Sequence, residues 1–233
     1  GAWMPGQPSG SRKFHTFAAD RPFALEGGIT LHGVTLAYET WGRLDPDGGN
    51  AVLLCHAWTG DSHATGAAER GHPTPGWWEG IVGPGLAIDT ERWFVVCINV
   101  LGGCQGSTGP ASAHPLDGRA YGGRFPVITI RDMVRAQVRL ADHLGVARWH
   151  SVVGGSMGGM QVLEWTIQAR NRVFAAVPIA VAPRQSAQNI GFYETGRQAI
   201  MADPKWKGGD YLAGKGPDDG LAVARTGAHT ADL

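Results

Sequence analysis

The 233-residue sequence contains no apolar run that approaches the roughly 20 residues of a membrane-spanning helix. It has no Lys/Arg-rich stretch either, and its 20 basic residues balance 20 acidic ones, so neither nucleic acid nor an anionic membrane is an expected partner. No combination of charged n-region, apolar h-region and cleavage site marks a secretion signal. The length and composition are those of an α/β domain with a sizeable core, alone or with a small appendage.

Cysteine is scarce, with only Cys55, Cys97 and Cys104 and no C-x-x-C pair. Cys55 and Cys97 fall inside apolar runs that are expected to be strands. Reduced thiols in a cytoplasmic protein are therefore expected rather than disulfides. Cys104 lies in a glycine-rich loop where it could be a nucleophile, but without a base nearby a small packing residue is the favoured interpretation.

Known metal and phosphate motifs are also missing. His56, His63 and His72 are spread over loops without an H-E-x-x-H motif or an i, i+4 pair, so no metal site is predicted. The glycine-rich stretch at residues 99–110 has no lysine that could complete a G-x-x-x-x-G-K-[ST] phosphate loop. We expect that stretch to be a structured loop bordering a pocket at the carboxyl end of a sheet.

Strands are indicated by continuous apolar runs. Four of them, residues 51–55, 93–99, 150–153 and 173–180, are typical of buried parallel strands, and Pro178 is expected at the end of the last run or at a bulge. Earlier in the chain, two loosely alternating segments flank Gly27-Gly28 and predict an antiparallel hairpin of residues 23–26 and 29–41.

A helix is predicted between the second and third of these runs, because residues 130–144 follow a 3.6-residue apolar period. Thr129 and Asp132 can form a capping box at its start, and Gly145 can end it. Strands that alternate with helices indicate a doubly wound, mostly parallel α/β sheet with right-handed crossovers.

The alternation stops after residue 184. Residues 186–202 and 220–229 are helix-like, and a Gly-, Lys- and Asp-rich stretch separates them. No further parallel strand is expected before the end of the sequence. We divide the chain into a disordered segment (residues 1–12), an α/β core (residues 13–184) and a helical lid region (residues 185–233).

The most informative motif is the G-x-S-x-G sequence centred on Ser156, with an apolar strand before it and a helix-forming stretch after it. Gly154 and Gly158 remove side chains that would collide where strand and helix cross in a sharp turn. The serine of such a turn is strained and projects its Oγ beyond the sheet. Ser156 is therefore the predicted nucleophile. The backbone N–H groups of Met157 and Trp58 are the predicted oxyanion hole.

With these segments assembled, the sequence resembles the homoserine O-acetyltransferase family of the α/β-hydrolase fold. The resemblance extends over about residues 15–230 and is carried in order by residues 56–63, 71–78, 99–110, 124–126, 130–132, 154–159, 199–203, 209–211 and 220–225. Trp58 stands where the family often has leucine, which affects only the shape of the pocket.

The resemblance implies a ping-pong reaction in methionine biosynthesis. Ser156 would take an acetyl group from acetyl-CoA, a co-substrate, and pass it to the hydroxyl of L-homoserine, with no permanently bound cofactor. Arg225 matches the family's substrate arginine, whose guanidinium suits the amino-acid carboxylate. The resemblance also implies a homodimer formed through the lid helices.

A catalytic acid and base are not found in the expected place. In this fold the order along the chain is Ser, then Asp or Glu, then His. After Ser156 the only histidine is His229, which falls in the lid-like stretch, and His56 precedes the serine at a strand end. Both positions disfavour a role as base, although Asp203, Asp210, Asp218 and Asp219 precede His229, so that chain order alone would permit a triad. We therefore expect a C-terminally truncated enzyme of low activity.

Two other functions remain open at this point. One is a hydrolase in which water replaces homoserine, and the other is a non-catalytic folded remnant. The sequence also leaves open a succinyl instead of an acetyl donor, and serine or another alcohol instead of homoserine.

Overall fold

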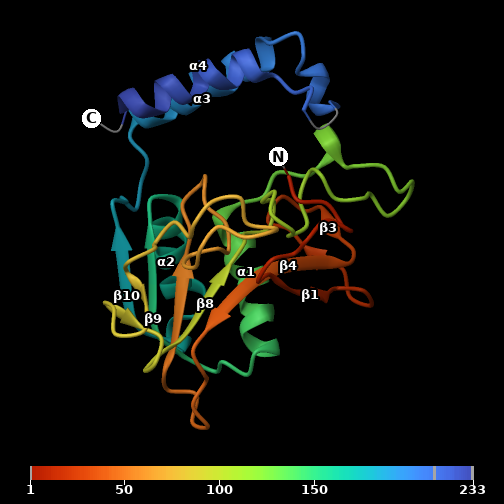
Figure 1. The fold of residues 1–233 in the computed structure, drawn as a ribbon. Helices are drawn as coiled ribbons and strands as arrows, with labels where there is room; N and C mark the ends of the chain where they lie inside the picture. Colours follow the sequence, from red (N-terminus) through yellow and green to blue (C-terminus); the bar gives the residue numbers. More distant parts are fainter. Residues whose placement is uncertain (1, 212–213, 232–233) are drawn as a thin grey trace.

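The computed structural model describes residues 2–211 and 214–231, with side chains up to residue 227. Its centre is a six-stranded sheet in the order β1-β4-β8-β5-β9-β10 (Figure 1). The strands are β1 (Lys13–Phe17), β4 (Val34–Trp41), β8 (Phe94–Ile98), β5 (Ala51–Cys55), β9 (Trp149–Gly155) and β10 (Val173–Ile179). The last four in this spatial order are parallel neighbours, which confirms the arrangement predicted from the four apolar runs.

Strand β5 lies between β8 and β9, and all five of its residues are buried because both faces of the sheet are covered. Leu53 belongs to the larger apolar cluster, which includes Val134 of α1 (Ile130–His143) and Val162 of α2 (Met157–Gln168). Leu54 points to the opposite face, where Trp77 and other side chains of the long segment before β8 pack. Alternate residues of one strand therefore join two cores.

The predicted start of helix α1 is confirmed. Thr129 accepts a hydrogen bond from the Asp132 N–H, and the Asp132 carboxylate accepts one from the Thr129 N–H, so the capping box is complete. The helix ends at His143, and Gly145 follows in the left-handed region with φ 73°. That conformation is the reason a glycine stands there.

The N-terminal expectations need two corrections. The predicted hairpin is reduced to two residues on each side, β2 (Phe23–Ala24) and β3 (Thr30–Leu31), whereas β4 pairs with β1 and β8. A long strand such as β4 needs partners on both sides to satisfy its backbone groups, and β1 provides one. Residues 2–12 also make defined contacts rather than forming a free tail: Trp3 stacks on Phe14 at 5.0 Å, and Arg12 is only 4% exposed.

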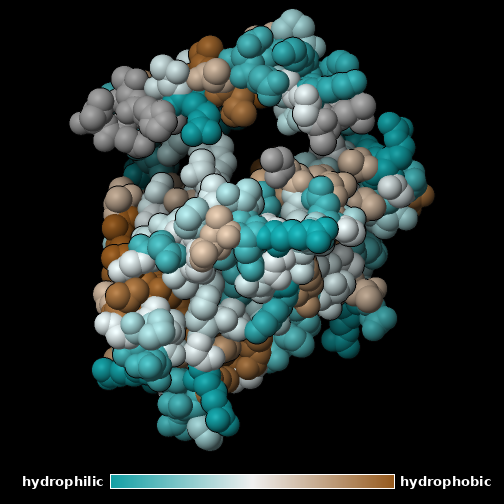
Figure 2. Space-filling model, in the orientation of Figure 1, coloured by the Kyte–Doolittle hydropathy of each residue, from teal (hydrophilic) through white to brown (hydrophobic). Residues whose placement is uncertain are grey.

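The chain after β10 forms a helical pair, α3 (Ala187–Ala202) and α4 (Asp218–Ala231), close to the predicted positions. The pair crosses above the carboxyl ends of the parallel strands (Figure 1), and Figure 2 shows an open hollow between it and the core. Asp203 fixes the start of α4 by accepting the Gly220 N–H at 3.0 Å.

Several short elements complete the described structure. They are β6 (Val82–Gly83), β7 (Ile88–Asp89), η1 (Gly122–Arg124), η2 (Arg170–Arg172) and η3 (Lys207–Gly209). Elements η1 and η3 lie in close contact, with no room for a Cβ on Gly123 against the backbone of Gly208. None of the described helices is long and apolar enough to cross a membrane.

Candidate active site

Ser156 occupies the turn between β9 and α2 with φ 54° and ψ −120°, which is rare for a residue with a side chain. The surrounding backbone holds this strained conformation, because the Ser156 N–H donates to the Ile179 carbonyl at 3.0 Å and its own carbonyl accepts the Met160 N–H at 3.1 Å. Ser156 is exposed at the carboxyl ends of the parallel strands. The nucleophile elbow inferred from the sequence is therefore present.

The glycines of the motif allow the elbow to pack directly on the end of β5. A Cβ on Gly154 would lie 2.7 Å from the Cys55 carbonyl oxygen, and a Cβ on Gly158 would overlap that carbonyl and approach the His56 carbonyl at 3.1 Å. No side chain fits in that space. The loop that follows β5, residues 56–61, consequently begins beside Ser156.

The two predicted oxyanion donors remain free to bind a ligand. Met157 is the first residue of α2, and an N–H at this position has no partner within its own helix. Trp58 lies in a turn closed by the Gly60 N–H, which donates to the Ala57 carbonyl at 2.9 Å. Among the described residues, neither the Met157 nor the Trp58 N–H forms a hydrogen bond. Their convergence near Ser156 Oγ stays a prediction.

Residues 50–230 match the sequence model of the alpha/beta hydrolase fold. This chain belongs to the α/β-hydrolase family. The family assignment agrees with the order and direction of the four parallel strands and with the elbow at Ser156.

Comparison with individual proteins shows which members of this family the chain is similar to. The chain is 56% identical to a homoserine O-acetyltransferase of Rhodospirillum rubrum over 218 residues, which are 92% of this chain and 55% of that protein. The crystal structure of homoserine O-acetyltransferase from Bacillus anthracis superposes with a TM-score of 0.85 at 32% identity, covering 94% of this chain and 59% of that one. Esterase E22 gives 0.84 at 31% identity, covering 95% and 61%. The resemblance inferred from the motifs is confirmed, and the α/β-hydrolase chain spans little more than half the length of these relatives.

His56 does not act as the base of this α/β-hydrolase. Its ring is 1% exposed, its Nδ1–H donates to the Ala57 carbonyl at 2.7 Å, and its Nε2 accepts the Val100 N–H at 3.1 Å. Burial lowers the pKa of His56 and keeps the ring neutral. Both nitrogens are occupied, and the Nε2 contact joins the end of β5 to the residues after β8, so the role of His56 is structural.

No other described side chain supplies the base. Within the part of the chain whose side chains are described, Ser156 Oγ forms no hydrogen bond to a histidine or a carboxylate. The backbone of His229 belongs to α4, and its side chain lies outside the described residues. Asp203 accepts the N–H groups of Lys205 and Gly220, which lower the pKa of its carboxyl and commit it to capping α4.

Arg225, the predicted substrate arginine, is exposed on α4 and forms no ion pair with the described residues. Trp58 provides a direct contact between the loop after β5 and helix α3. Its indole is 69% exposed and meets the ring of Tyr193 on α3 edge-on at 5.9 Å. The two residues are 135 positions apart in the sequence, so no local pattern reveals that their rings are in contact.

The three cysteines are free. Cys55 and Cys97 are buried in strands, and burial raises the pKa of both thiols, so they are unreactive packing residues. Cys104 is exposed, and its carbonyl accepts the Trp3 N–H at 2.8 Å. The expectation that Cys104 is a packing residue is wrong, because the loop turns its side chain outward.

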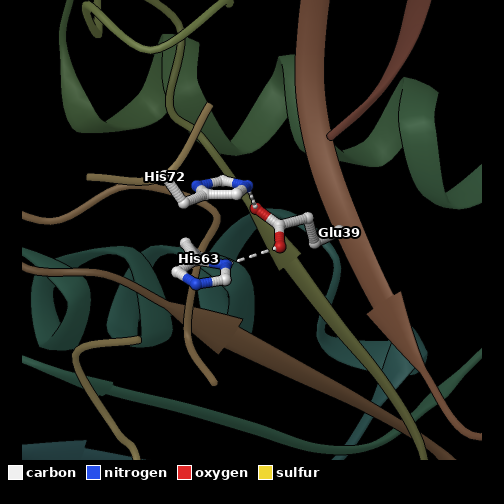
Figure 3. Close-up of side chains that lie close together, drawn as sticks. All are labelled: Glu39, His63 and His72. Carbon is white, nitrogen blue, oxygen red and sulfur yellow. Dashed lines mark hydrogen bonds and ion pairs between the residues drawn. The ribbon is translucent and has the colours of Figure 1, made fainter. Parts of the chain in front are cut away.

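Sequence spacing also missed a buried cluster of Glu39, His63 and His72, shown in Figure 3. His63 Nδ1 lies 2.9 Å and His72 Nε2 3.4 Å from the Glu39 carboxylate oxygens. These are residue types that bind metals, but the two rings face each other at 3.7 Å and 12°. Lone pairs in nearly parallel ring planes do not converge on one ion. The arrangement fits a hydrogen-bonded network better than a metal centre.

Proposed function

We propose that this chain carries the nucleophile, the oxyanion hole and the lid of an acyltransferase that moves an acetyl group from acetyl-CoA to L-homoserine. The strained elbow at Ser156 is the observation that carries the proposal, since it presents the hydroxyl where a thioester can reach it. The 56% identity to the homoserine O-acetyltransferase of Rhodospirillum rubrum supports the choice of substrates.

In the first half-reaction, Ser156 Oγ would attack the thioester carbonyl carbon of acetyl-CoA. The negative charge that develops on the carbonyl oxygen would be stabilised by the N–H groups of Met157 and Trp58. The C–S bond then breaks, CoA leaves as a thiol with the proton from the serine, and an acetyl-serine remains.

In the second half-reaction, the homoserine hydroxyl would attack the acetyl-serine carbonyl carbon. The bond from that carbon to Ser156 Oγ then breaks, the proton of the homoserine hydroxyl passes to Oγ, and O-acetylhomoserine leaves. This step needs a site that admits homoserine and keeps water away. Arg225 on α4 is the proposed partner of the homoserine carboxylate, because a guanidinium binds a carboxylate through two parallel hydrogen bonds. Helix α4, which contains Arg225, lies above the carboxyl ends of the parallel strands (Figure 1), and this supports the role.

The rate of this 233-residue chain by itself is expected to be low. No base contacts Ser156 Oγ among the side chains that are described. Enzymes of this type that lack triad members retain only about 10³–10⁴-fold acceleration over water, from the oxyanion hole and binding. We expect acetyl transfer in that residual range.

The test measures CoA release from acetyl-CoA with and without L-homoserine, together with O-acetylhomoserine by mass spectrometry. Homoserine-dependent release that disappears in Ser156→Ala supports the proposal. Release that is independent of homoserine identifies a hydrolase, which is the activity named for esterase E22. If neither occurs and Ser156 also fails to react with an active-site phosphonate, the chain is a non-catalytic remnant.

Location and assembly are part of the same proposal. Three free thiols support a reducing, cytoplasmic environment. The lid helices support a homodimer, because they expose four apolar side chains: Ile190, Met201, Leu221 and Val223. Light scattering after size-exclusion chromatography would give twice the monomer mass if the lid forms the contact, and Val223→Lys should reduce it.

A further inference from the structure

Glu39, His63 and His72 form a buried cluster (Figure 3), and His63 ends the loop that carries Trp58. This loop starts at the carboxyl end of β5 and closes at His63, after which the chain enters the segment that covers the second core. A mobile loop could not hold the Trp58 N–H at a fixed point. The contacts at its two ends therefore decide whether an oxyanion donor is preorganised.

The first end of the loop is fixed by His56. Its ring bonds the Ala57 carbonyl and the Val100 N–H, and its carbonyl accepts the Gln161 side-chain amide at 3.3 Å. Because Gln161 belongs to α2, this contact ties the loop to the helix that follows Ser156.

The second end is fixed by Glu39 of β4, which is 1% exposed. One carboxylate oxygen accepts the Ser62 hydroxyl at 2.8 Å, and the other accepts the His63 Nδ1–H at 2.9 Å. The nitrogen His72 Nε2 lies 3.4 Å away on the third side. A buried carboxylate that lost these partners would be strongly unfavourable, so the network holds Ser62 and His63 firmly.

The backbone of two glycines lies close to the outer sides of the two imidazole rings. A Cβ on Gly66 would be 3.1 Å from His63 Cε1, and one on Gly10 would overlap the His72 ring. The rings also stack on each other at 3.7 Å. Because both rings are closely packed, we expect His63 to keep one orientation relative to the Glu39 carboxylate, and the end of the loop with it.

Asp61 adds a separate contact just before this end. It pairs with Arg12 at 3.1 Å and accepts the His63 N–H at 2.8 Å, and its carbonyl accepts the Trp77 indole N–H at 3.0 Å. Between the two fixed ends, Trp58 and Thr59 form an exposed tip. The loop is therefore held at both ends, and the short turn between them, closed by the Gly60 N–H to the Ala57 carbonyl, carries the donor.

We propose that Glu39 is a positioning residue for acyl transfer, which holds the Trp58 N–H in place through Ser62 and His63 without touching the substrate. This inference rests on the proposed function for its kinetic consequence, but not for its structural one. Removing the carboxylate should loosen residues 56–63 while leaving the elbow at Ser156 intact.

The experiment compares Glu39→Gln and the milder Ser62→Ala with a matched control, Glu91→Gln, whose side chain is exposed and forms none of these contacts. Amide hydrogen exchange is followed by mass spectrometry in peptides from residues 56–66 and from residues 149–168. The acylation rate constant with acetyl-CoA is measured per reactive Ser156, counted by phosphonate titration.

We expect faster exchange only in residues 56–66 and an acylation rate about 10- to 100-fold lower, as for a catalytic group displaced by about 1 Å. The KM for acetyl-CoA should change less than threefold, and Ser62→Ala should give a smaller effect of the same kind. If Glu39→Gln does not fold, Ser62→Ala alone decides the matter. Unchanged exchange, or faster exchange with an unchanged rate constant, would overturn the proposal. Absence of acetyl transfer in the unaltered protein would refute the proposed function, but the exchange result would still test whether Glu39 holds the loop of residues 56–63 in place.

Discussion

Gly158 offers the sharpest test of the elbow, because an added methyl group there meets backbone rather than a flexible side chain. A Cβ on Gly158 would lie 2.8 Å from the Cys55 carbonyl carbon, closer than side chains are found in real structures. Gly158→Ala therefore has two opposing effects. Alanine favours the helix by about 1 kcal/mol, and overpacking against a rigid strand costs about 3 kcal/mol or more.

The expected net loss is about 2 kcal/mol of unfolding free energy, and for a chain of this size that lowers Tm by roughly 4–8 °C. The clash cannot be relieved by β5, which is buried between β8 and β9. The start of α2 must move instead, and the Met157 N–H moves with it. The reaction of Ser156 with a phosphonate should therefore slow in the variant.

The control is Gly155→Ala in the same motif. No atom lies within 4 Å of a Cβ built on Gly155. Alanine should be neutral or favourable by about 0.5–1 kcal/mol there. It serves as a control for stability only, because Gly155 adjoins the nucleophile. Thermal and urea unfolding of both variants give the comparison. Equal stabilities for Gly158→Ala and Gly155→Ala would refute the tight packing of the elbow on β5.

Three further outcomes are expected. Arg225→Ala should raise the homoserine KM about 10- to 100-fold, the usual cost of a hydrogen-bonded charge, with the acetyl-CoA half-reaction nearly unchanged; equal loss in both half-reactions would make Arg225 structural. Burial and the nearby Arg12 lower the pKa of His72 from 6.5 to about 4, so the folded state resists a proton that the unfolded state accepts. The contribution of His72 to stability is therefore fully present above pH 6.5, and the unfolding free energy should fall by at most about 3 kcal/mol between pH 6.5 and pH 4. This fall should be smaller in His72→Gln. A urea midpoint that does not change over this pH range would contradict the assignment. Figure 2 shows apolar surface along β10, where Val177 and Ile179 are each 42% exposed. Replacing both residues with lysine should reduce the self-association measured by sedimentation velocity without unfolding the chain. Unchanged self-association would mean that the contact lies elsewhere.

Much of the fold follows from short-range patterns in the sequence. The apolar runs of β5 and β8 have no alternation because both faces of these strands are covered, and that property is visible without coordinates. The run of β10 predicts a buried strand as well, but β10 is the last strand of the sheet and its residues are only partly buried or exposed. The capping box at Thr129 involves residues three apart, and the glycines around Ser156 lie two positions on either side. Each of these signals depends on neighbours along the chain, so the sequence carries it completely.

The tertiary structure decided the contacts between distant segments. It paired β4 with β1 and β8 instead of with a hairpin partner, and it brought Trp58 against Tyr193. It also placed Glu39 beside His63 and His72, although their spacing in the sequence matches no metal or catalytic motif.

The physical reason is that these contacts depend on how whole layers pack. Glu39 alternates with apolar residues along β4, and nothing local marks it as buried until the segment before β8 covers that face of the sheet. A buried carboxylate is tolerated there only because Ser62 and His63, from another part of the chain, donate hydrogen bonds to it. The sequence by itself indicated which residue is the candidate nucleophile and how its turn is built. Only the packing of β4, β5 and the following loop decided which side chains hold the rest of the site in place.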